Sequence, residues 1–300
     1  MRILVSGSTG LVGSALVPRL AAGGHTVVRL VRAKAIPGEN GIAWNPATGI
    51  LEAPALEGFD AVIHLAGESI ASGRWTHAKK ARIRDSRVVG TALLADRIAG
   101  LSRPPGVLLC ASAIGFYGHR GDETLREDSA PGKDFLGRVC RDWEAAAEPA
   151  ARKGVRVVRL RFGVILSPLG GALAKMLTPF RLGLGGPIGD GRQYMSWIAI
   201  DDAVDSLLHA LTAKLSPGPV NIVSPNPATN AEFTQTLGRV LGRPAFMPMP
   251  AFAARLAFGE MADALLLSSQ RVAPDRLVAS GYAFRYPALE PALRHLLGRH

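Results

Sequence analysis

Hydrophobic residues fall in short β-rich runs that alternate with stretches of helical spacing over the first two thirds of the chain. This alternation is typical of βαβ units, which build a parallel sheet covered by helices on both faces. The predicted strands are Arg2 to Val5, His25 to Val31, Ala61 to Leu65, Val107 to Ala111, Val155 to Leu160 and Val220 to Val223. The predicted helices are Leu11 to Ala22, Trp75 to Ala99, Arg138 to Lys153, Ala172 to Leu182, and Asp201 to Ala213 with Asp201 as its cap.

The last third of the chain contains more turn signals. Residues 163–191 are dense in Gly and Pro, and a further helix runs from a cap at Thr229 or Asn230 to Leu241. Proline residues then separate short helical stretches, the last of them near Pro291 to Leu297. This change of character predicts a second, smaller lobe that packs against the sheet.

The predicted fold class is α/β, a doubly wound parallel sheet of the Rossmann type with a smaller C-terminal substrate lobe. Residues 1–166 and 195–223 are assigned to the sheet domain, and residues 167–194 and 224–300 to the substrate-binding lobe. With 48% hydrophobic and 20% charged residues among 300, the chain buries enough apolar surface to fold, which excludes a disordered protein.

Targeting and redox signals are sparse. No window approaches about 18 uninterrupted apolar residues, so no membrane span is expected. The N-terminal run MRILVSGSTG is typical of a first strand that enters a glycine turn, not of a secretory signal. Cys110 and Cys140 form neither a disulfide framework nor a zinc-binding spacing, so we expect a cytoplasmic protein without a metal.

The net charge of +11 comes from 35 Lys and Arg residues against 24 Asp and Glu residues. A basic balance can indicate a nucleic-acid-binding protein, but here the positive residues are scattered, without a basic arm or aromatic platform. We therefore expect no nucleic-acid partner, and we attribute a few of the charges to binding of an anionic small molecule.

A glycine-rich turn gives the strongest functional signal. Gly7, Gly10 and Gly13 are spaced GxxGxxG, directly after the first strand and at the start of a helix. This context is the one required of a dinucleotide fingerprint, although the usual spacing is GxGxxG. We expect Gly7 to allow the tight turn, Gly10 to let the pyrophosphate approach bare backbone, and Gly13 to let the helix pack on the strand. The first-turn N–H groups would then face the phosphates.

The end of the second strand indicates which dinucleotide binds. NAD sites place an Asp or Glu about twenty residues after the glycine turn, where it binds the ribose hydroxyls. Here that position holds Arg32 and Lys34, and no acid occurs before Glu39. An arginine binds the extra phosphate of NADP as a planar fork, so we predict NADP(H), the alternative being a solvated arginine at a strand end.

Together these residues resemble the short-chain dehydrogenase/reductase superfamily, in its extended, epimerase-like branch, and most closely a subgroup of epimerase-family oxidoreductases of unknown substrate. The resemblance covers essentially the whole chain. The similar stretches are Gly7–Gly13, Leu65–Glu68, Ser112–Gly118, Asp142–Ala146, Arg161–Leu166, Pro179–Gly189, Trp197–Ile198 before Asp201 and Asp202, Asn230–Phe233 and the proline-punctuated C-terminal segment.

This resemblance implies a set of cofactor contacts: Gly7, Thr9, Gly10, Leu11, Val12, Arg32, Leu65, Ala66 and Arg87. Gly13 of the glycine fingerprint and Gly67 at the end of the third strand are predicted to belong to the same site. Phe162 and Ile165 follow the fifth strand, where chains of this superfamily line the nicotinamide end. Two of these positions have ordinary alternatives. Leu65 to Gly67 would otherwise be a plain strand-to-loop turn, and Arg87 a helix-surface arginine.

The chain departs from the superfamily at its catalytic pair. A Tyr-x-x-x-Lys pair normally lies on the helix after the fourth strand, where the Tyr exchanges a proton and the Lys lowers its pKa. One register places Phe135 and Val139 there, and another places Leu136 and Cys140. Neither register contains a phenol or an amine, and Cys140 is expected to be a small buried residue rather than a nucleophile.

Ser112 and Tyr117 are the nearest candidates for proton transfer. If Tyr117 is the acid, its phenol should keep a pKa near ~10, and Tyr117→Phe should lower turnover by ~10²–10⁴-fold. The alternatives are a turn hydroxyl for Ser112 and an aromatic loop anchor for Tyr117. Trp197, His64 and Tyr194 are further candidates for lining a substrate pocket, although Trp197 is also typical of a core residue.

Two functions of different class follow from these residues. The first is an NADP(H)-dependent oxidoreductase or epimerase-like enzyme that acts on an unidentified small molecule. The second is a catalytically silent NADP(H)-binding sensor or regulator that kept the fold and lost the Tyr-Lys pair. The sequence predicts neither the substrate nor the oligomeric state.

Overall fold

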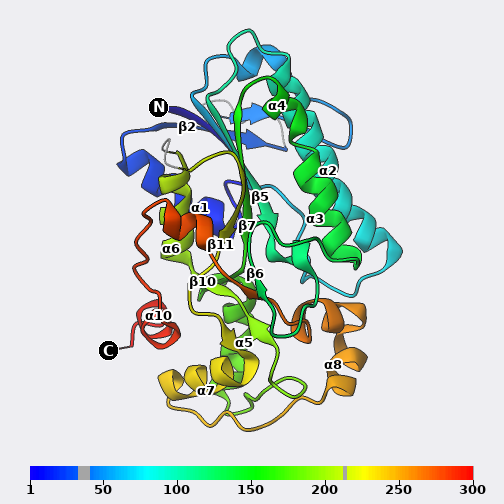
Figure 1. The fold of residues 1–300 in the computed structure, drawn as a ribbon, viewed down its shortest axis with the longest axis vertical. Helices are drawn as coiled ribbons and strands as arrows, with labels where there is room; N and C mark the ends of the chain where they lie inside the picture. Colours follow the sequence, from blue (N-terminus) through cyan, green and yellow to red (C-terminus); the bar gives the residue numbers. More distant parts are fainter. Residues whose placement is uncertain (33–40, 212–214, 300) are drawn as a thin grey trace.

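A parallel sheet forms the centre of the computed structural model, which describes residues 1–32, 41–211 and 215–299. The described residues give it seven strands in the order β11-β7-β5-β4-β1-β2-β3 (Figure 1). Its strands are β1 (Arg2–Ser6), β2 (Thr26–Val31), β3 (Gly41–Ala43), β4 (Ala61–His64), β5 (Val107–Ala113), β7 (Arg156–Phe162) and β11 (Gly218–Ile222). The strand order reverses between β1 and β4, and sheets of this kind bind ligands at that point.

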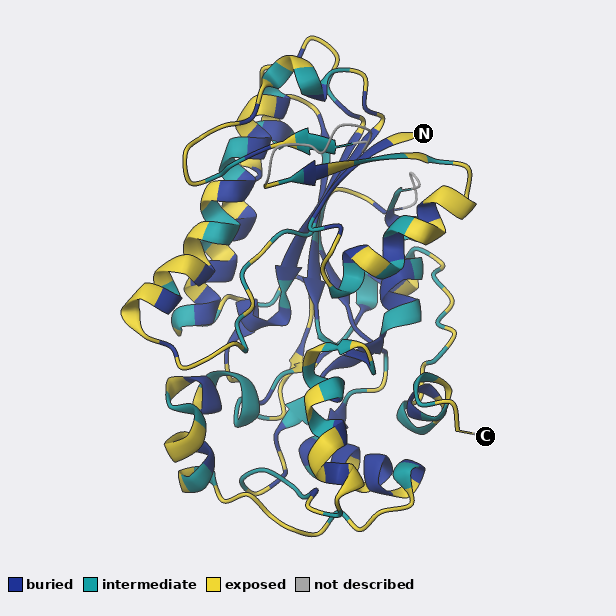
Figure 2. Ribbon diagram, turned by 180° about the vertical axis from the view of Figure 1, so that it is seen from behind, coloured by how far each residue is buried: buried dark blue, intermediate teal, exposed yellow. Residues whose placement is uncertain are grey.

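Helices cover both faces of this sheet. α1 (Leu11–Ala22) packs against α6 (Ile200–Leu211) on one face, while α2 (His77–Ala99) lies with α3 (Phe135–Ala145) and α4 (Glu148–Arg152) on the other (Figure 1). The central strands are dark in Figure 2 because both of their faces are buried. Such strands read as continuous apolar runs, and the predicted doubly wound sheet is confirmed.

A second hydrophobic core lies beyond the carboxyl ends of the strands. It is built by α5 (Gly171–Arg181), α7 (Asn230–Leu241) and α10 (Leu289–Leu296) around buried residues that include Leu173, Phe180, Trp197, Phe233 and Leu293. Two short ladders belong to this region, β8 (Val164–Ser167) with β10 (Trp197–Ala199) and β9 (Tyr194–Met195) with β12 (Ala228–Thr229). Trp197 is completely buried, as expected for a core residue.

The C-terminal residues divide between the two cores. After α8 (Ala251–Phe258) and a single π-helical turn at Ala262–Leu266, β13 (Arg271–Val272) pairs with β6 (Thr124–Leu125). α9 (Asp275–Ala279) then packs on β11, and its Leu277 belongs to the main core. The predicted division into two lobes therefore needs a finer boundary within residues 224–300.

Two predicted helices differ in detail from the structure. The helix expected from Arg138 to Lys153 is two helices, because α3 ends at Ala145 and Pro149 lies in the first turn of α4, where its missing N–H is tolerated. The predicted cap Asp201 lies inside the first turn of α6, which begins at Ile200, and Ala213 lies outside the described residues. α7 begins as predicted, with Thr229 as its cap.

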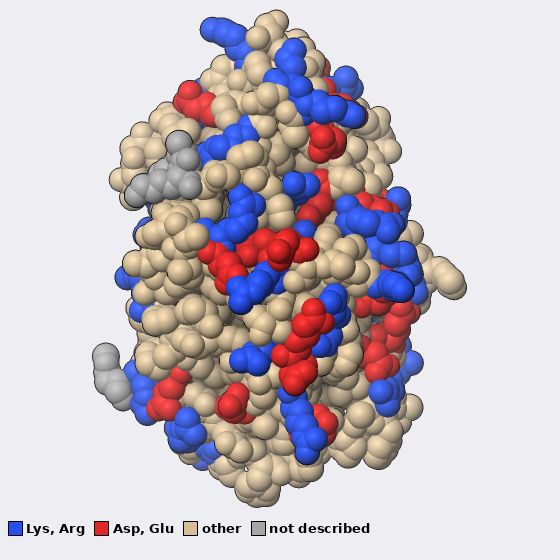
Figure 3. Space-filling model, viewed as in Figure 1, with Lys and Arg blue, Asp and Glu red and all other residues tan. Residues whose placement is uncertain are grey.

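Surface properties agree with the charge pattern of the sequence. Lys and Arg side chains alternate with Asp and Glu side chains over the face shown in Figure 3. Within the described parts of the chain, no helix has the length and apolar character that a membrane crossing requires.

Candidate functional site

The glycine turn lies at the point where the strand order reverses. Gly7 has φ +67°, and a Cβ there would lie 2.7 Å from the Leu65 carbonyl carbon, so the turn requires glycine. The Gly10 N–H donates to the Gly7 carbonyl oxygen at 3.0 Å, and α1 begins at the next residue without a side-chain cap. The first-turn N–H groups of α1 consequently have no intrahelical acceptor and are available to a ligand.

The other two glycines face opposite environments. A Cβ on Gly13 would lie 2.2 Å from the Gly7 carbonyl oxygen, so α1 can approach β1 this closely only without a side chain. Gly10 is exposed, and its Cβ would meet only the Gly7 oxygen, at 3.3 Å. The tight turn at Gly7 and the close packing at Gly13 are as predicted, and Gly10 presents bare backbone to the outside.

A buried hydrogen-bond network fixes the end of β4 against this turn. The backbone N–H groups of Leu65 and Ala66 both donate to the Ser6 hydroxyl oxygen, at 3.2 and 3.3 Å. The Ser6 hydroxyl itself lies 2.6 Å from His64 Nδ1, and it is therefore the donor in that bond. This network holds Leu65 and Ala66 beside the glycine turn, where a Cβ on Gly7 would contact the backbone of both residues.

His64 does not line a substrate pocket. It is completely buried, and its ring meets the Trp44 ring edge-on at 5.7 Å. Burial lowers the pKa of His64 to about 4, so the ring is neutral, and Nε2 finds no hydrogen-bond partner in the described part of the chain. His64 is a core residue that orients Ser6, whereas Tyr194 is half-buried.

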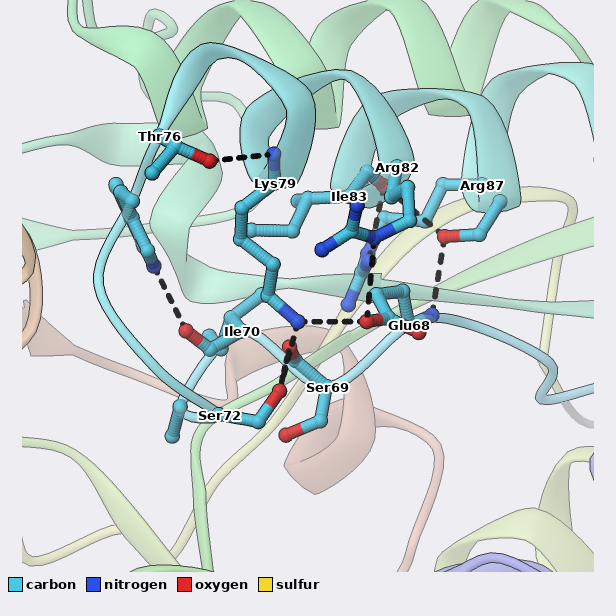
Figure 4. A network of polar contacts seen from close by, with 12 residues as sticks. Glu68, Ser69, Ile70, Ser72, Thr76, Lys79, Arg82, Ile83 and Arg87 are labelled. Carbon is cyan, nitrogen blue, oxygen red and sulfur yellow. Dashed lines mark hydrogen bonds and ion pairs between the residues drawn. The ribbon is translucent and has the colours of Figure 1, made fainter.

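A charged network next to Gly67 was not predicted (Figure 4). Lys79 Nζ, which is almost completely buried, donates to Glu68 Oε1 at 2.6 Å and to the Ser72 hydroxyl at 2.7 Å. The hydrogen bond from Lys79 is the main cause that holds the pKa of Glu68 below its usual value. Arg82 lies 4.0 Å from the same carboxylate, and Ser86 accepts the Glu68 backbone N–H. The signal in the sequence was an acid directly after the Leu-Ala-Gly run and a lysine in the first turn of α2.

Arg32 and Arg87 both lie close to this network. Arg32 is exposed just past β2, and its charge contributes to the lowered pKa of Glu68. Arg87 lies against Gly67, because a Cβ there would be 3.4 Å from the guanidinium carbon, and its charge stands over the Trp143 ring at 5.2 Å. Arg87 is therefore half-buried rather than a surface residue. Lys34 and Glu39 lie outside the described residues.

The start of α5 lies close to the glycine turn. A Cβ on Gly170 or Gly171 would lie 3.1 or 3.2 Å from the side chain of Leu11, so this turn packs on the first residue of α1. Phe162 ends β7 and is buried, and Ile165, in β8, is half-buried against the main core. The structure thus brings the glycine turn, the loop after β4 and the glycine pair at the start of α5 together.

The two candidates for proton transfer are both buried in a separate network. The Ser112 hydroxyl donates to Glu144 Oε1 at 2.7 Å. The Tyr117 hydroxyl donates to Asn221 Oδ1 at 2.7 Å and accepts from Arg161 at 2.9 Å. Burial raises the pKa of the Tyr117 phenol, whereas an ordinary value was expected. Tyr117 has no exposed surface, which agrees with the alternative interpretation of this residue as an aromatic anchor of the loop.

A buried ion pair organises this network. Arg161 forms a bidentate ion pair with Glu144, in which Nε donates to Oε1 at 2.7 Å and Nη2 donates to Oε2 at 2.9 Å. Its remaining nitrogen donates to the Tyr117 hydroxyl and to the Glu127 carbonyl oxygen. The sequence did not predict this pair, because Glu144 on α3 and Arg161 on β7 become neighbours only when α3 packs on the sheet.

The structure also distinguishes the two registers of the missing Tyr-Lys pair. Leu136 and Cys140 approach Gly115, just after β5, whereas Phe135 turns away and stacks edge-on with Trp75 at 5.4 Å. Leu136 and Cys140 therefore occupy the side of α3 that faces the strand end. Burial raises the pKa of the Cys140 thiol to about 12, so it is no thiolate nucleophile. Among the residues described, no cluster of His, Cys, Asp or Glu has the makeup of a metal site.

Comparison with known proteins gives two family matches. Residues 3–223 match the NAD dependent epimerase/dehydratase family, and residues 249–296 match a domain of unknown function, DUF1731. The epimerase family protein Mb2239 of Mycobacterium bovis is 43% identical over 297 residues, which cover 99% of this chain and 98% of that protein.

Two solved structures are similar over 99% of this chain. The crystal structure of human epimerase family protein SDR39U1 (isoform 2) with NADPH has a TM-score of 0.90 and 40% identity, and 99% of that chain is covered. The nucleoside-diphosphate sugar epimerase from Corynebacterium glutamicum has a TM-score of 0.82 and 41% identity, with 58% of that longer chain covered.

Proposed function

Because this chain belongs to the NAD dependent epimerase/dehydratase family, we propose that it is an NADP(H)-dependent oxidoreductase or epimerase-like enzyme acting on a small molecule. The observation that carries the proposal is the glycine turn, whose exposed Gly10 backbone and uncapped helix end fit a pyrophosphate. NADPH in the crystal structure of the human relative supports the choice of cofactor. When bound, NADP(H) supplies or accepts a hydride.

The positions of these residues support the proposed contacts. The N–H groups at the start of α1 bind the pyrophosphate, Arg32 binds the phosphate that distinguishes NADP(H), and Arg87 stands beside Gly67. Lys79 donates to Glu68 Oε1 at 2.6 Å, so the carboxylate near Arg32 is already paired within the protein. The complete proposed set is Gly7, Thr9, Gly10, Leu11, Val12, Gly13, Arg32, Leu65, Ala66, Gly67, Arg87, Phe162 and Ile165.

Arg32→Ala tests the choice of cofactor. Because a charge-assisted contact to the extra phosphate contributes about 1–3 kcal/mol, the unmutated protein should bind NADPH more tightly than NADH by that amount. The variant should lose most of the difference and keep its NADH affinity, as measured by calorimetry. Arg299→Ala, at an exposed arginine near the C-terminus, should change neither affinity. Equal affinity for both cofactors in the unmutated protein would rule out this role for Arg32.

A catalytically silent NADP(H) sensor is the second candidate function. It is favoured by the absence of a phenol and an amine on α3 and by the burial of both Ser112 and Tyr117. The protein should be incubated with NADPH and panels of carbonyl compounds and sugar nucleotides while absorbance reports oxidation. Oxidation by one compound supports the enzyme, whereas NADPH that persists for hours with every compound supports the sensor.

Tyr117→Phe separates a structural from a catalytic role of the phenol. Because the variant leaves Asn221 Oδ1 buried without its donor, we expect the free energy of unfolding to fall by about 1–3 kcal/mol. NADPH affinity and any turnover found in the panels should stay unchanged. A fall in turnover of ~10²–10⁴-fold would instead make Tyr117 the proton donor. Urea unfolding and initial rates on the same preparation give both quantities.

A further inference from the structure

A cavity of about 750 Å³ lies away from the glycine turn, on the face of the sheet that α2, α3 and α4 cover. Its floor is formed by β7 and the edge strand β11, and its walls by the ends of α3 and α4. None of the proposed cofactor contacts lines it. The charged residues around it are Asp96, Arg141, Glu144, Glu148, Arg152, Arg159 and Arg161.

Arg159 is the unusual member of this set. It lies on β7, next to Cys110 of β5 and Pro219 of β11, and its side chain is half-buried. Its Nε is shielded from solvent and has no hydrogen-bond partner, and no carboxylate of the described residues lies within 4.0 Å of it. Buried polar groups almost always have a partner, so the Nε–H of Arg159 is a donor without an acceptor among the described residues, on a side chain that is otherwise partly open to the cavity.

The neighbouring arginine cannot be the group that binds a ligand. Arg161, two residues along the same strand, already donates to Glu144, to the Tyr117 hydroxyl and to the Glu127 carbonyl. Its fork neutralises Glu144, the one carboxylate in the cavity wall that is deeply buried. Arg141 pairs with Asp142, so among the described lining residues the positive charges without an ion pair are those of Arg159 and of the exposed Arg152. The exposed carboxylates of Asp96 and Glu148 have no ion pair with a described residue either, but neither lies within 4.0 Å of Arg159.

We propose that this cavity is an anion-binding site, separate from the cofactor site, in which Arg159 binds a phosphate or carboxylate group. A guanidinium presents parallel N–H donors that match both groups, and it does so best where water is partly excluded. Phe116, Pro149 and Pro219 line the same cavity, so the ligand carries its anionic group on a compact apolar body. The proposal does not depend on the function proposed above.

The Nε–H resonance of Arg159 reports binding through the guanidinium group of which Nε is a part. The ¹⁵N-labelled protein is examined in two series, one without NADPH and one with NADPH at saturation, and ionic strength is held constant with sodium chloride. A shift at Arg159 that is the same in both series does not arise from anions in the cofactor site. Inorganic phosphate and benzoate are then titrated separately. We expect a saturable shift of this resonance with at least one of them, and comparing the two tells a phosphate ligand from a carboxylate ligand. The absence of a saturable shift with either probe would overturn the proposal.

Two variants and a control complete the test. For each protein we measure how far the midpoint of thermal unfolding rises when the probe that shifted the Arg159 resonance is added. Arg159→Gln should weaken the response at least ~10-fold, since a charged donor is lost, and Arg159→Lys should give an intermediate loss because charge remains without the fork. Arg103→Gln removes an exposed arginine outside the cavity and should behave as the unmutated protein. Equal responses in all four proteins would also overturn the proposal, because they would indicate a general salt effect.

Discussion

Substituting valine for Gly10 is expected to abolish measurable NADPH binding in a protein that still folds. Gly10 has φ −76° and ψ 174°, which any residue adopts, and its Cβ would approach only the Gly7 carbonyl oxygen. The valine side chain would then occupy the space in which the pyrophosphate meets the N–H groups of α1. Because the pyrophosphate would lose its charge-assisted hydrogen bonds to these N–H groups, each worth about 1.5–3 kcal/mol, binding is expected to fall below what the titration detects. Fluorescence titration with NADPH and circular dichroism of the free protein measure the two effects.

Gly13→Ala is the matched control, because it adds a side-chain atom to the same turn on the side where α1 packs against the backbone of Gly7 and Ser8. Its Cβ would lie 2.2 Å from the Gly7 oxygen and 2.7 Å from Ser8 Cα, and both are backbone atoms. Overpacking of this kind lowers the free energy of unfolding by about 1–3 kcal/mol or more. If Gly10→Val bound NADPH as tightly as the unmutated protein, this turn would not be the phosphate site.

Arg161→Met is expected to cause the largest loss of stability, about 3–5 kcal/mol, because Glu144 would remain buried with its charge unpaired. Methionine keeps much of the volume and the contact with the Phe116 ring, over which the guanidinium now lies at 3.5 Å. Urea unfolding of the cofactor-free protein measures the change. Methionine at Arg255, whose pair with Asp263 is exposed, is the control and should leave stability nearly unchanged.

A double variant isolates the unpaired charge as the cause. Glu144→Gln combined with Arg161→Met removes both charges, so it should be more stable than Arg161→Met alone. Ser112 would still find an acceptor in the glutamine amide. A double variant that is less stable than the single one would show that packing around Arg161, and not the buried carboxylate, determines the loss.

The parts predicted well from the sequence are those that depend on neighbours along the chain. Strand hydrophobicity, the capping residue Thr229 and the spacing of Gly7, Gly10 and Gly13 act within a few residues, so their consequences are visible locally. The proline at Pro149 was also a local signal, which the prediction of one long helix overlooked.

The parts that were missed depend on contacts between distant segments. Glu144 pairs with Arg161 because α3 packs on β5, the neighbour of β7 in the sheet. Tyr117 is anchored by Asn221, which the chain reaches only in β11, the last strand of the sheet along the sequence. An exposed loop tyrosine and a buried one have the same sequence signal. The role of Tyr117 therefore depended on topology, which the spacing of residues 112–118 does not contain.

The position of β11 bears on how the chain folds during synthesis. This edge strand pairs with β7, although residues 163–217 come between them and contribute β8, α5, β10 and α6. Until residues 218–222 have been synthesised, β7 presents an unpaired strand edge, and such edges favour aggregation. A polypeptide stopped before residue 218 is therefore expected to need a chaperone rather than to fold as an independent small domain.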